Sequence, residues 1–176
     1  MFYIEVNEDI RLKLLQDNDK YEFFALMEKN RSFLEKTMPR INENRSIEDT
    51  EKVIKLFLNQ LAENNGFKLG VIYRGKLVGI VGLKYIDWLN KKTEIMYWID
   101  KDHSGKGIST ACTKAIIKIV FEELQLNKAI LTINPDNLPS IRIAEKCGFE
   151  LEGTLKEEEK LLDGYGDLNV YGLINK

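Results

Sequence analysis

A glycine-bearing segment, Asp102–Thr110, lies between two runs of different pattern. The run before it, Lys92–Asp100, has the composition of a strand, and the run after it, Gly107–Leu124, has the apolar spacing of a helix. A strand that leads through glycines into the start of a helix points free backbone N–H groups at one place, which suits a bound phosphate. Gly105 and Gly107 would let the main chain approach a ligand where a Cβ would obstruct it. The alternative is an ordinary glycine turn into a helix.

Two common phosphate loops are excluded for this segment. The P-loop spacing Gly-x-x-x-x-Gly-Lys-Ser/Thr does not fit it. A dinucleotide-binding fingerprint would need a third glycine three residues after Gly107, where Thr110 stands. The segment therefore predicts a phosphate-bearing ligand of another kind.

A second segment, Asn134–Glu150, has the pattern of a turn followed by a short helix. Asn137 is a favourable N-cap, and Gly148 is a favourable stop.

Together the two segments resemble the GNAT superfamily of acetyl-CoA-dependent N-acetyltransferases. The first is similar to the pyrophosphate loop of that family, Arg/Gln-x-x-Gly-x-Gly/Ala, although Ser104 stands where Arg or Gln is usual and Ser109 where Gly or Ala is usual. The second is similar to the family's helix signature, which here comprises Asn137, Ser140, Glu145, Lys146, Gly148, Phe149, Glu152 and Gly153. The strand Glu94–Trp98 and the tail Asp163–Asp167 resemble the Rim-type branch, which acetylates N-terminal amines of ribosomal proteins.

The resemblance implies a single GNAT domain over residues 1–176, an α/β (α+β) fold with a mixed, mostly antiparallel central sheet of about seven strands flanked by helices. Local patterns alone predict a mixed α/β sheet with helices packed on it. We expect strands at Ile10–Leu15, Phe67–Tyr73, Lys76–Tyr85, Lys92–Asp100, Lys128–Ile133, Phe149–Leu155 and Leu168–Ile174, and helices at Asn18–Asn30, Ser46–Asn64, Gly107–Leu124 and Asn137–Cys147.

The composition fits one soluble enzyme domain. A chain of 176 residues can bury roughly 70% of its unfolded surface, which is enough for one core. No apolar run approaches the ~18 residues that span a membrane, and no signal peptide is visible, so we expect no membrane partner. Cys112 and Cys147 show no metal or redox spacing, which predicts no metal site and suits the cytoplasm. A net charge of −2 argues against nucleic-acid binding.

Acetyl transfer to an amine needs a neutral amine, donors for the oxyanion and a proton for the leaving thiolate. An α-amine has a pKa of about 7.7–8.0 and a lysine one of about 10.4, so a single carboxylate is a more adequate base for an N-terminus than for a lysine. We interpret Glu94 as that base, because it is an ionisable residue in the otherwise apolar run Glu94–Ile99. The resemblance implies the same role, since Glu94 matches the glutamate that looks catalytic at this strand position in Rim-type enzymes. The alternative is a glutamate on the solvent face of an amphipathic strand.

The resemblance also implies the general acid and the cofactor contacts. Ser140, in the first turn of its helix, matches the serine proposed as general acid in the Rim-type branch; the alternative is a serine that satisfies backbone N–H groups. We expect Tyr165 and Trp88 to shape the substrate pocket. The predicted contacts of acetyl-CoA are Tyr97, Trp98, Ile99, Ser104, Gly105, Lys106, Gly107, Ile108, Ser109, Thr110, Asn134 and Asn137.

Two other features receive smaller roles. His103, the only histidine, is expected near the phosphate or in solvent and not in catalysis. The acidic run Glu157–Glu159 is interpreted as a solvated edge that could attract a cationic substrate.

The sequence thus predicts a cytoplasmic N-acetyltransferase that transfers the acetyl group of acetyl-CoA directly to an amine, most simply the N-terminal α-amine of a ribosomal or other protein. Acetylation of a small amine, such as a polyamine or an aminoglycoside, is the first alternative. A non-catalytic sensor of acyl-CoA is the second. A homodimer is left open.

Overall fold

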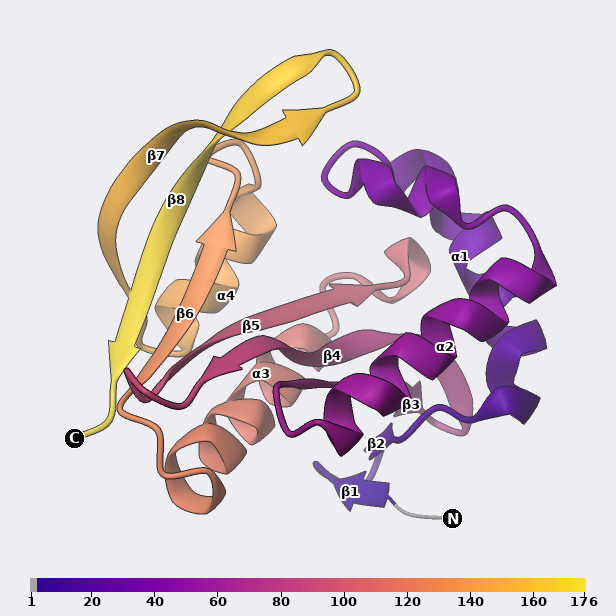
Figure 1. The fold of residues 1–176 in the computed structure, drawn as a ribbon, viewed down its shortest axis with the longest axis horizontal. Coiled ribbons are helices and arrows are strands. Elements are labelled where there is room, and N and C mark those ends of the chain that lie inside the picture. The colour runs from indigo at the N-terminus through magenta and orange to yellow at the C-terminus, as the bar shows by residue number, and fades with distance from the viewer. Residues whose placement is uncertain (1–2) are drawn as a thin grey trace.

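The computed structural model describes residues 3–176, which form one eight-stranded sheet with helices packed on it (Figure 1). The strand order is β1-β2-β3-β4-β5-β6-β8-β7, and every neighbouring pair is antiparallel except β5 and β6. The strands are β1 (Tyr3–Glu5), β2 (Ile10–Lys13), β3 (Phe67–Tyr73), β4 (Lys76–Asp87), β5 (Lys92–Ile99), β6 (Lys128–Ile133), β7 (Glu150–Leu161) and β8 (Gly164–Ile174). The helices are α1 (Lys20–Leu34), α2 (Ile47–Ala62), α3 (Ile108–Lys118) and α4 (Leu138–Lys146), with 3-10 turns at Asp17–Asp19, Pro39–Glu43 and Lys101–His103 and a π-helical turn at Ile119–Glu123.

Two helix pairs cover the two faces of the sheet. Successive side chains of a strand point to opposite faces. Along β5, Ile95 and Ile99 therefore pack in the core beneath α3 and α4, whereas Met96 and Trp98 pack in the core beneath α1 and α2. The strand β5 thus contributes to both hydrophobic cores.

The predicted elements are present, and their capping signals act as expected. The Ser46 side chain accepts a hydrogen bond from the Asp49 N–H at 3.1 Å and begins α2. The Asn137 side chain caps α4, and Gly148 follows that helix with φ 84°. No helix within residues 3–176 is long and apolar enough to cross a lipid bilayer.

The structure adds strand residues that the sequence pattern did not predict. Strand β1 brings the number of strands to eight; it has three exposed residues at the sheet edge and so shows no apolar alternation. The hairpin of β7 and β8 is longer than predicted, since it runs to Leu161 and restarts at Gly164. Most of β7 is exposed on both faces, which removes the alternation that marks a half-buried strand. The helix predicted to reach Leu124 instead changes to a π-helical turn after Lys118.

Strands β5 and β6 are hydrogen-bonded neighbours only at their beginnings. Their parallel register ends at the pair Glu94–Ile130, and no further pair forms between them within residues 3–176. Beyond this point β5 stays paired with β4, and β6 stays paired with β8. The two strands diverge, as Figure 1 shows, and each keeps one backbone edge free of a strand partner. Backbone N–H and C=O groups need partners, so this gap is a natural place for an extended ligand.

The Gly79→Ala variant should destabilise the protein. Gly79 lies in β4 opposite Ile99, and a Cβ there would lie 2.1 Å from the Trp98 carbonyl oxygen. Such overpacking costs about 1–3 kcal/mol, so we expect Tm to fall by roughly 2–12 °C in thermal circular dichroism.

Gly153→Ala is the matched control, because Gly153 lies in β7 with open space at its Cβ position. Its Tm should stay within about 2 °C of wild type. A Gly79→Ala protein as stable as this control would contradict the close contact between β4 and β5.

Candidate active site

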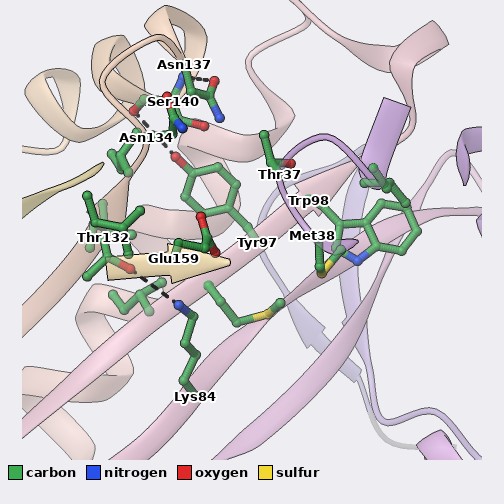
Figure 2. A pocket seen from close by; sticks show the side chains of 16 residues that line it. Thr37, Met38, Lys84, Tyr97, Trp98, Thr132, Asn134, Asn137, Ser140 and Glu159 are labelled. Carbon is green, nitrogen blue, oxygen red and sulfur yellow. Dashed lines mark hydrogen bonds between the residues drawn. The ribbon is translucent and has the colours of Figure 1, made fainter. Parts of the chain in front are cut away.

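A cavity of about 180 Å³ lies where β5 and β6 diverge (Figure 2). It receives side chains from both diverging strands, from the start of α4, from β7 and from the end of α1. The lining residues are Leu34, Thr37, Met38, Lys84, Ile95, Met96, Tyr97, Trp98, Leu131, Thr132, Ile133, Asn134, Asn137, Ser140, Glu159 and Leu168.

An irregularity in β4 places a cation beside this cavity. The register of β4 and β5 shifts between Leu83 and Ile86, opposite Glu94. A bulge of this kind redirects a side chain, and here it brings the Lys84 ammonium to the Glu94 carboxylate and to the Thr132 hydroxyl. The Thr132 hydroxyl also donates to Glu94. A dashed line between Lys84 and Thr132 in Figure 2 marks their hydrogen bond, which is 3.3 Å long.

Glu94 is enclosed and is not a solvent-facing residue of the strand. Its side chain is 12% exposed, and its Oε1 accepts from both Lys84 and Thr132. Lys84 and Thr132 line the cavity, whereas Glu94 contacts them without being part of the lining. The carboxylate predicted as the base therefore contacts two residues of the cavity lining but is not itself part of that lining.

A second carboxylate, Glu159, lines the cavity itself. Figure 2 shows it beside Lys84, Thr132 and Tyr97. Burial raises the pKa of Glu159 above its usual value; the charge of Lys84 opposes this change and that of Glu94 adds to it. A carboxylate with a raised pKa inside a cavity is suited to accept a proton.

Sequence reasoning missed Glu159, because it is the third residue of an acidic run that resembles a solvated edge. The available signal was the glycine-rich tail. Glu159 pairs with Gly166 across the hairpin, which returns β7 and β8 over the cavity.

The start of α4 brings a hydroxyl to the opposite wall. Asn137 Oδ1 accepts from the Ser140 N–H at 3.3 Å, which fixes the first turn of the helix. The Tyr97 hydroxyl donates to the Ser140 carbonyl at 3.5 Å. Burial raises the pKa of Tyr97 to about 12, so this phenol stays protonated at neutral pH. Asn134 also lines the cavity, and its side chain accepts from the Asp136 N–H.

The glycine segment enters α3 as predicted. Gly105 and Gly107 have φ values of 77° and 75°, in the region that favours glycine, and no atom lies within 4 Å of their Cβ positions. The first hydrogen bond of α3 runs from the Ala111 N–H to the Gly107 carbonyl. The N–H groups of Ile108, Ser109 and Thr110 therefore have no partner within the helix. An anion at this end would meet free donors and the positive end of the helix dipole.

The residues that flank the glycines make internal contacts, Ser104 through its backbone and Lys106 and His103 through their side chains. Ser104 N–H donates to the Lys101 carbonyl at 3.1 Å, and the Lys106 ammonium lies 5.9 Å from the Tyr73 ring centroid. His103 Nδ1 lies 2.9 Å from Asp100 Oδ2, and its ring packs edge-on against Tyr73. His103 thus stabilises the loop through its contacts with Asp100 and Tyr73.

Apart from Glu94 and the residues of the glycine segment, the predicted residues outside the cavity lining are Ile99, Trp88 and Tyr165. The Ile99 side chain is buried in the core under α3, so only its backbone remains available. Trp88 packs beyond the end of β4, where its indole N–H donates to the Asn64 carbonyl at 2.7 Å. Tyr165 is 63% exposed near the hairpin turn, with the Lys160 ammonium over its ring. Neither Trp88 nor Tyr165 lines the cavity between β5 and β6, and their role in a substrate pocket stays a prediction.

Comparison with known proteins identifies relatives that span the chain. A family model described as an acetyltransferase (GNAT) domain matches residues 9–150. The chain is 35% identical over 178 residues to YdaF of Bacillus subtilis (strain 168), covering 100% of this chain and 97% of YdaF. It is 32% identical over 173 residues to the ribosomal-protein-serine acetyltransferase of Escherichia coli (strain K12), covering 97% and 96% of the two chains.

Two further matches differ in what they cover. The spermidine N(1)-acetyltransferase of Escherichia coli (strain K12) is 32% identical over 84 residues, which is 48% of this chain and 45% of that enzyme. The solved structure of RimL, a ribosomal L7/L12 alpha-N-protein acetyltransferase in complex with coenzyme A, has a TM-score of 0.95 at 22% identity and covers 98% of both chains. This last likeness shows that the folds are the same.

Replacing Glu159 by glutamine should stabilise the protein at neutral pH. A carboxyl whose pKa is raised in the folded state binds more protons folded than unfolded, so its ionisation removes stability as the pH rises above its ordinary value of 4.5. We expect Glu159→Gln to raise Tm by roughly 1–3 °C at pH 7.5 and the difference to vanish toward pH 4.

Glu158→Gln changes the same functional group at the exposed neighbour and should leave Tm unchanged at both pH values. Equal Tm values for Glu159→Gln and wild type across this range would contradict the burial of Glu159 in the cavity.

Proposed function

The chain belongs to the family of GNAT acetyltransferase domains, and from this we propose that it transfers the acetyl group of acetyl-CoA to the N-terminal α-amine of a protein, of the ribosomal-protein type. The observation that carries the proposal is the cavity between β5 and β6. This cavity combines a carboxylate, a serine at the start of a helix and two free strand edges. One of its walls is β5, the strand that leads into the glycine loop.

The cofactor would lie along the gap. The pyrophosphate of acetyl-CoA would accept hydrogen bonds from the N–H groups of residues 105–110 at the start of α3. The extended pantetheine arm would pair with the free edge of β5 beyond Glu94, as a further strand does in a sheet. Tyr97, Trp98 and Asn134 line the cavity at the end of this path, where the thioester would stand.

The amine proton would pass to a carboxylate. The amine nitrogen attacks the thioester carbon, the C–S bond breaks, and the nitrogen loses one proton. A base must come within hydrogen-bond reach of that proton, directly or through one water. Glu159 lines the cavity, whereas Glu94 is held by Lys84 and Thr132 behind it. We therefore assign the proton to Glu159 and give Glu94 the role of holding Lys84 and Thr132 in place.

The leaving thiolate would take a proton from Ser140. The Asn137 cap and the bond from Tyr97 both hold the main chain of Ser140 in position. The Tyr97 phenol is kept neutral by burial and supports the acid without replacing it.

An N-terminal α-amine fits this chemistry better than a lysine or a polyamine. Its pKa of about 7.7–8.0 leaves a sizeable neutral fraction at pH 7, so one carboxylate is sufficient. The relative named for ribosomal-protein serine aligns over nearly the whole chain, whereas the one named for spermidine aligns over about half of it. These coverages support a protein N-terminus as the acceptor.

The glycine loop should be required for cofactor binding. Coenzyme A at ~100 times its Kd should add about 2.7 kcal/mol of stability to the wild type, which is a measurable rise in Tm. The Gly107→Asp variant places a negative charge at the proposed pyrophosphate site and should lose this rise while its circular dichroism spectrum stays folded.

Gly153→Asp makes the same substitution at an open position in β7 and should keep the full rise in Tm. NADH should stabilise none of the proteins. A Gly107→Asp variant that keeps the rise would show that coenzyme A is held elsewhere.

Catalysis should depend on Glu159. Glu159→Gln should lower kcat by roughly 10²–10⁴ at pH 7, with partial recovery at higher pH, where more of the α-amine is already neutral. Ser140→Ala should also lower kcat, but its kcat should not recover at higher pH. This variant keeps the base and lacks the proton donor for the thiolate. The assay measures free coenzyme A released with a six-residue peptide that begins with serine.

Glu94→Gln is the matched variant for this assay. A larger loss of kcat in Glu94→Gln than in Glu159→Gln would return the base to Glu94, as the sequence predicted. Faster turnover of spermidine than of the peptide would contradict the proposed acceptor, and release with neither acceptor would favour a sensor.

A further inference from the structure

We propose that Lys29 and Asn30 of α1 are positioning residues that hold the glycine loop and couple it to the acceptor cavity. The inference rests on the proposed function of that loop. Neither residue lines the cavity or belongs to the loop segment 100–107.

The loop begins at a buried carboxylate that depends on α1. Asp100 follows β5 directly, and its side chain is 3% exposed. Its Oδ2 lies 2.8 Å from the Lys29 ammonium and 2.9 Å from His103 Nδ1, whereas its buried Oδ1 has no hydrogen-bond partner within residues 3–176. Burial would raise the pKa of Asp100, but hydrogen bonds, first of all from Lys29, outweigh it and hold the pKa at about 2. A buried ionised group whose partner is removed is strongly destabilised.

Two further contacts join α1 to the same loop. The Lys29 ammonium also lies 2.7 Å from Asp102 Oδ2. The buried Asn30 side chain accepts from the Lys101 N–H at 3.0 Å and donates to the Leu26 carbonyl at 3.0 Å. Helix α1 therefore holds three successive loop residues, Asp100, Lys101 and Asp102, just before the glycines.

The same helix ends at the cavity. Leu34, the last residue of α1, lines the cavity, and so do Thr37 and Met38 in the turn that follows. Leu34 lies five positions after Lys29, which is about 7.5 Å along a rigid helix. A shift of the glycine loop therefore moves the wall that an acceptor would touch, and an acceptor that presses on this wall acts on the loop.

Coupling of this kind is reciprocal and has a defined measurement. If α1 links the two sites, a bound acceptor peptide changes the affinity for coenzyme A. The test titrates coenzyme A calorimetrically with and without a saturating six-residue peptide that begins with serine, a pair that cannot react. The variants are Lys29→Met, which keeps the stem and removes the charge, and Lys29→Arg, which restores it.

Lys20→Met is the matched control. Lys20 lies on the same helix and makes ion pairs with Asp17 and Glu51, away from the loop. We expect Lys29→Met to weaken coenzyme A binding by about 5- to 20-fold and to abolish the effect of the peptide. Lys29→Arg should recover most of the affinity for coenzyme A and most of the peptide effect. Lys20→Met should lower Tm but change neither the affinity nor the peptide effect.

The outcomes separate this inference from the proposed function. A wild-type protein that does not bind coenzyme A contradicts the function itself. A wild type that binds it, with a Lys29→Met variant of equal affinity and equal peptide effect, overturns the positioning role. Equal losses in Lys29→Met and Lys20→Met also overturn it, because they show general loosening of α1. If Lys29→Met does not fold, Lys29→Gln, which removes the charge and shortens the side chain but stays polar, is measured against the same criteria.

Discussion

The site depends on the early end of the pairing between β5 and β6. These are the one parallel pair of the sheet, and their register stops at Glu94 and Ile130. Because β4 and β8 continue to bond the outer edges of the two strands, the divergence does not unfold either of them. It exposes backbone groups that would otherwise be satisfied within the sheet. A sheet that stayed fully paired here would have neither the cavity nor an edge for the cofactor.

A carboxylate lies at each end of this opening, Glu94 in β5 and Asp100 directly after it, and a lysine of a neighbouring element pairs with each one. Glu94 meets Lys84, which reaches it through the bulge of β4. Asp100 meets Lys29 of α1. Ion pairs of this kind give little net stability once desolvation is counted. The role that we propose for them is geometric: the Glu94 pair holds Lys84 at the cavity, and the Asp100 pair holds the glycine loop.

Glu159 is the carboxylate for which we propose the chemical task, and no hydrogen bond or ion pair holds its side chain within residues 3–176. Glu159 lies on the hairpin of β7 and β8 and lines the cavity, and burial raises its pKa. The cost of burying it lowers the stability of the fold, as is common for groups that must exchange protons. Glu94 and Glu159 thus lie in different environments, and we propose a structural role for Glu94 and a catalytic role for Glu159.

The sequence by itself determined the features that depend on neighbours along the chain. The glycine loop with its left-handed backbone, the caps Ser46 and Asn137, and the order of the elements all follow from local chemistry. Only the tertiary structure decided which polar side chains share the cavity. Glu159 belongs to an acidic run that looks like solvated surface, and Lys84 is a single charge near the end of an otherwise apolar strand. In the sequence, a charged residue that faces a cavity and one that faces water give the same pattern. Their placement follows from a bulge register and from hairpin packing, which are set by contacts between residues far apart in the chain.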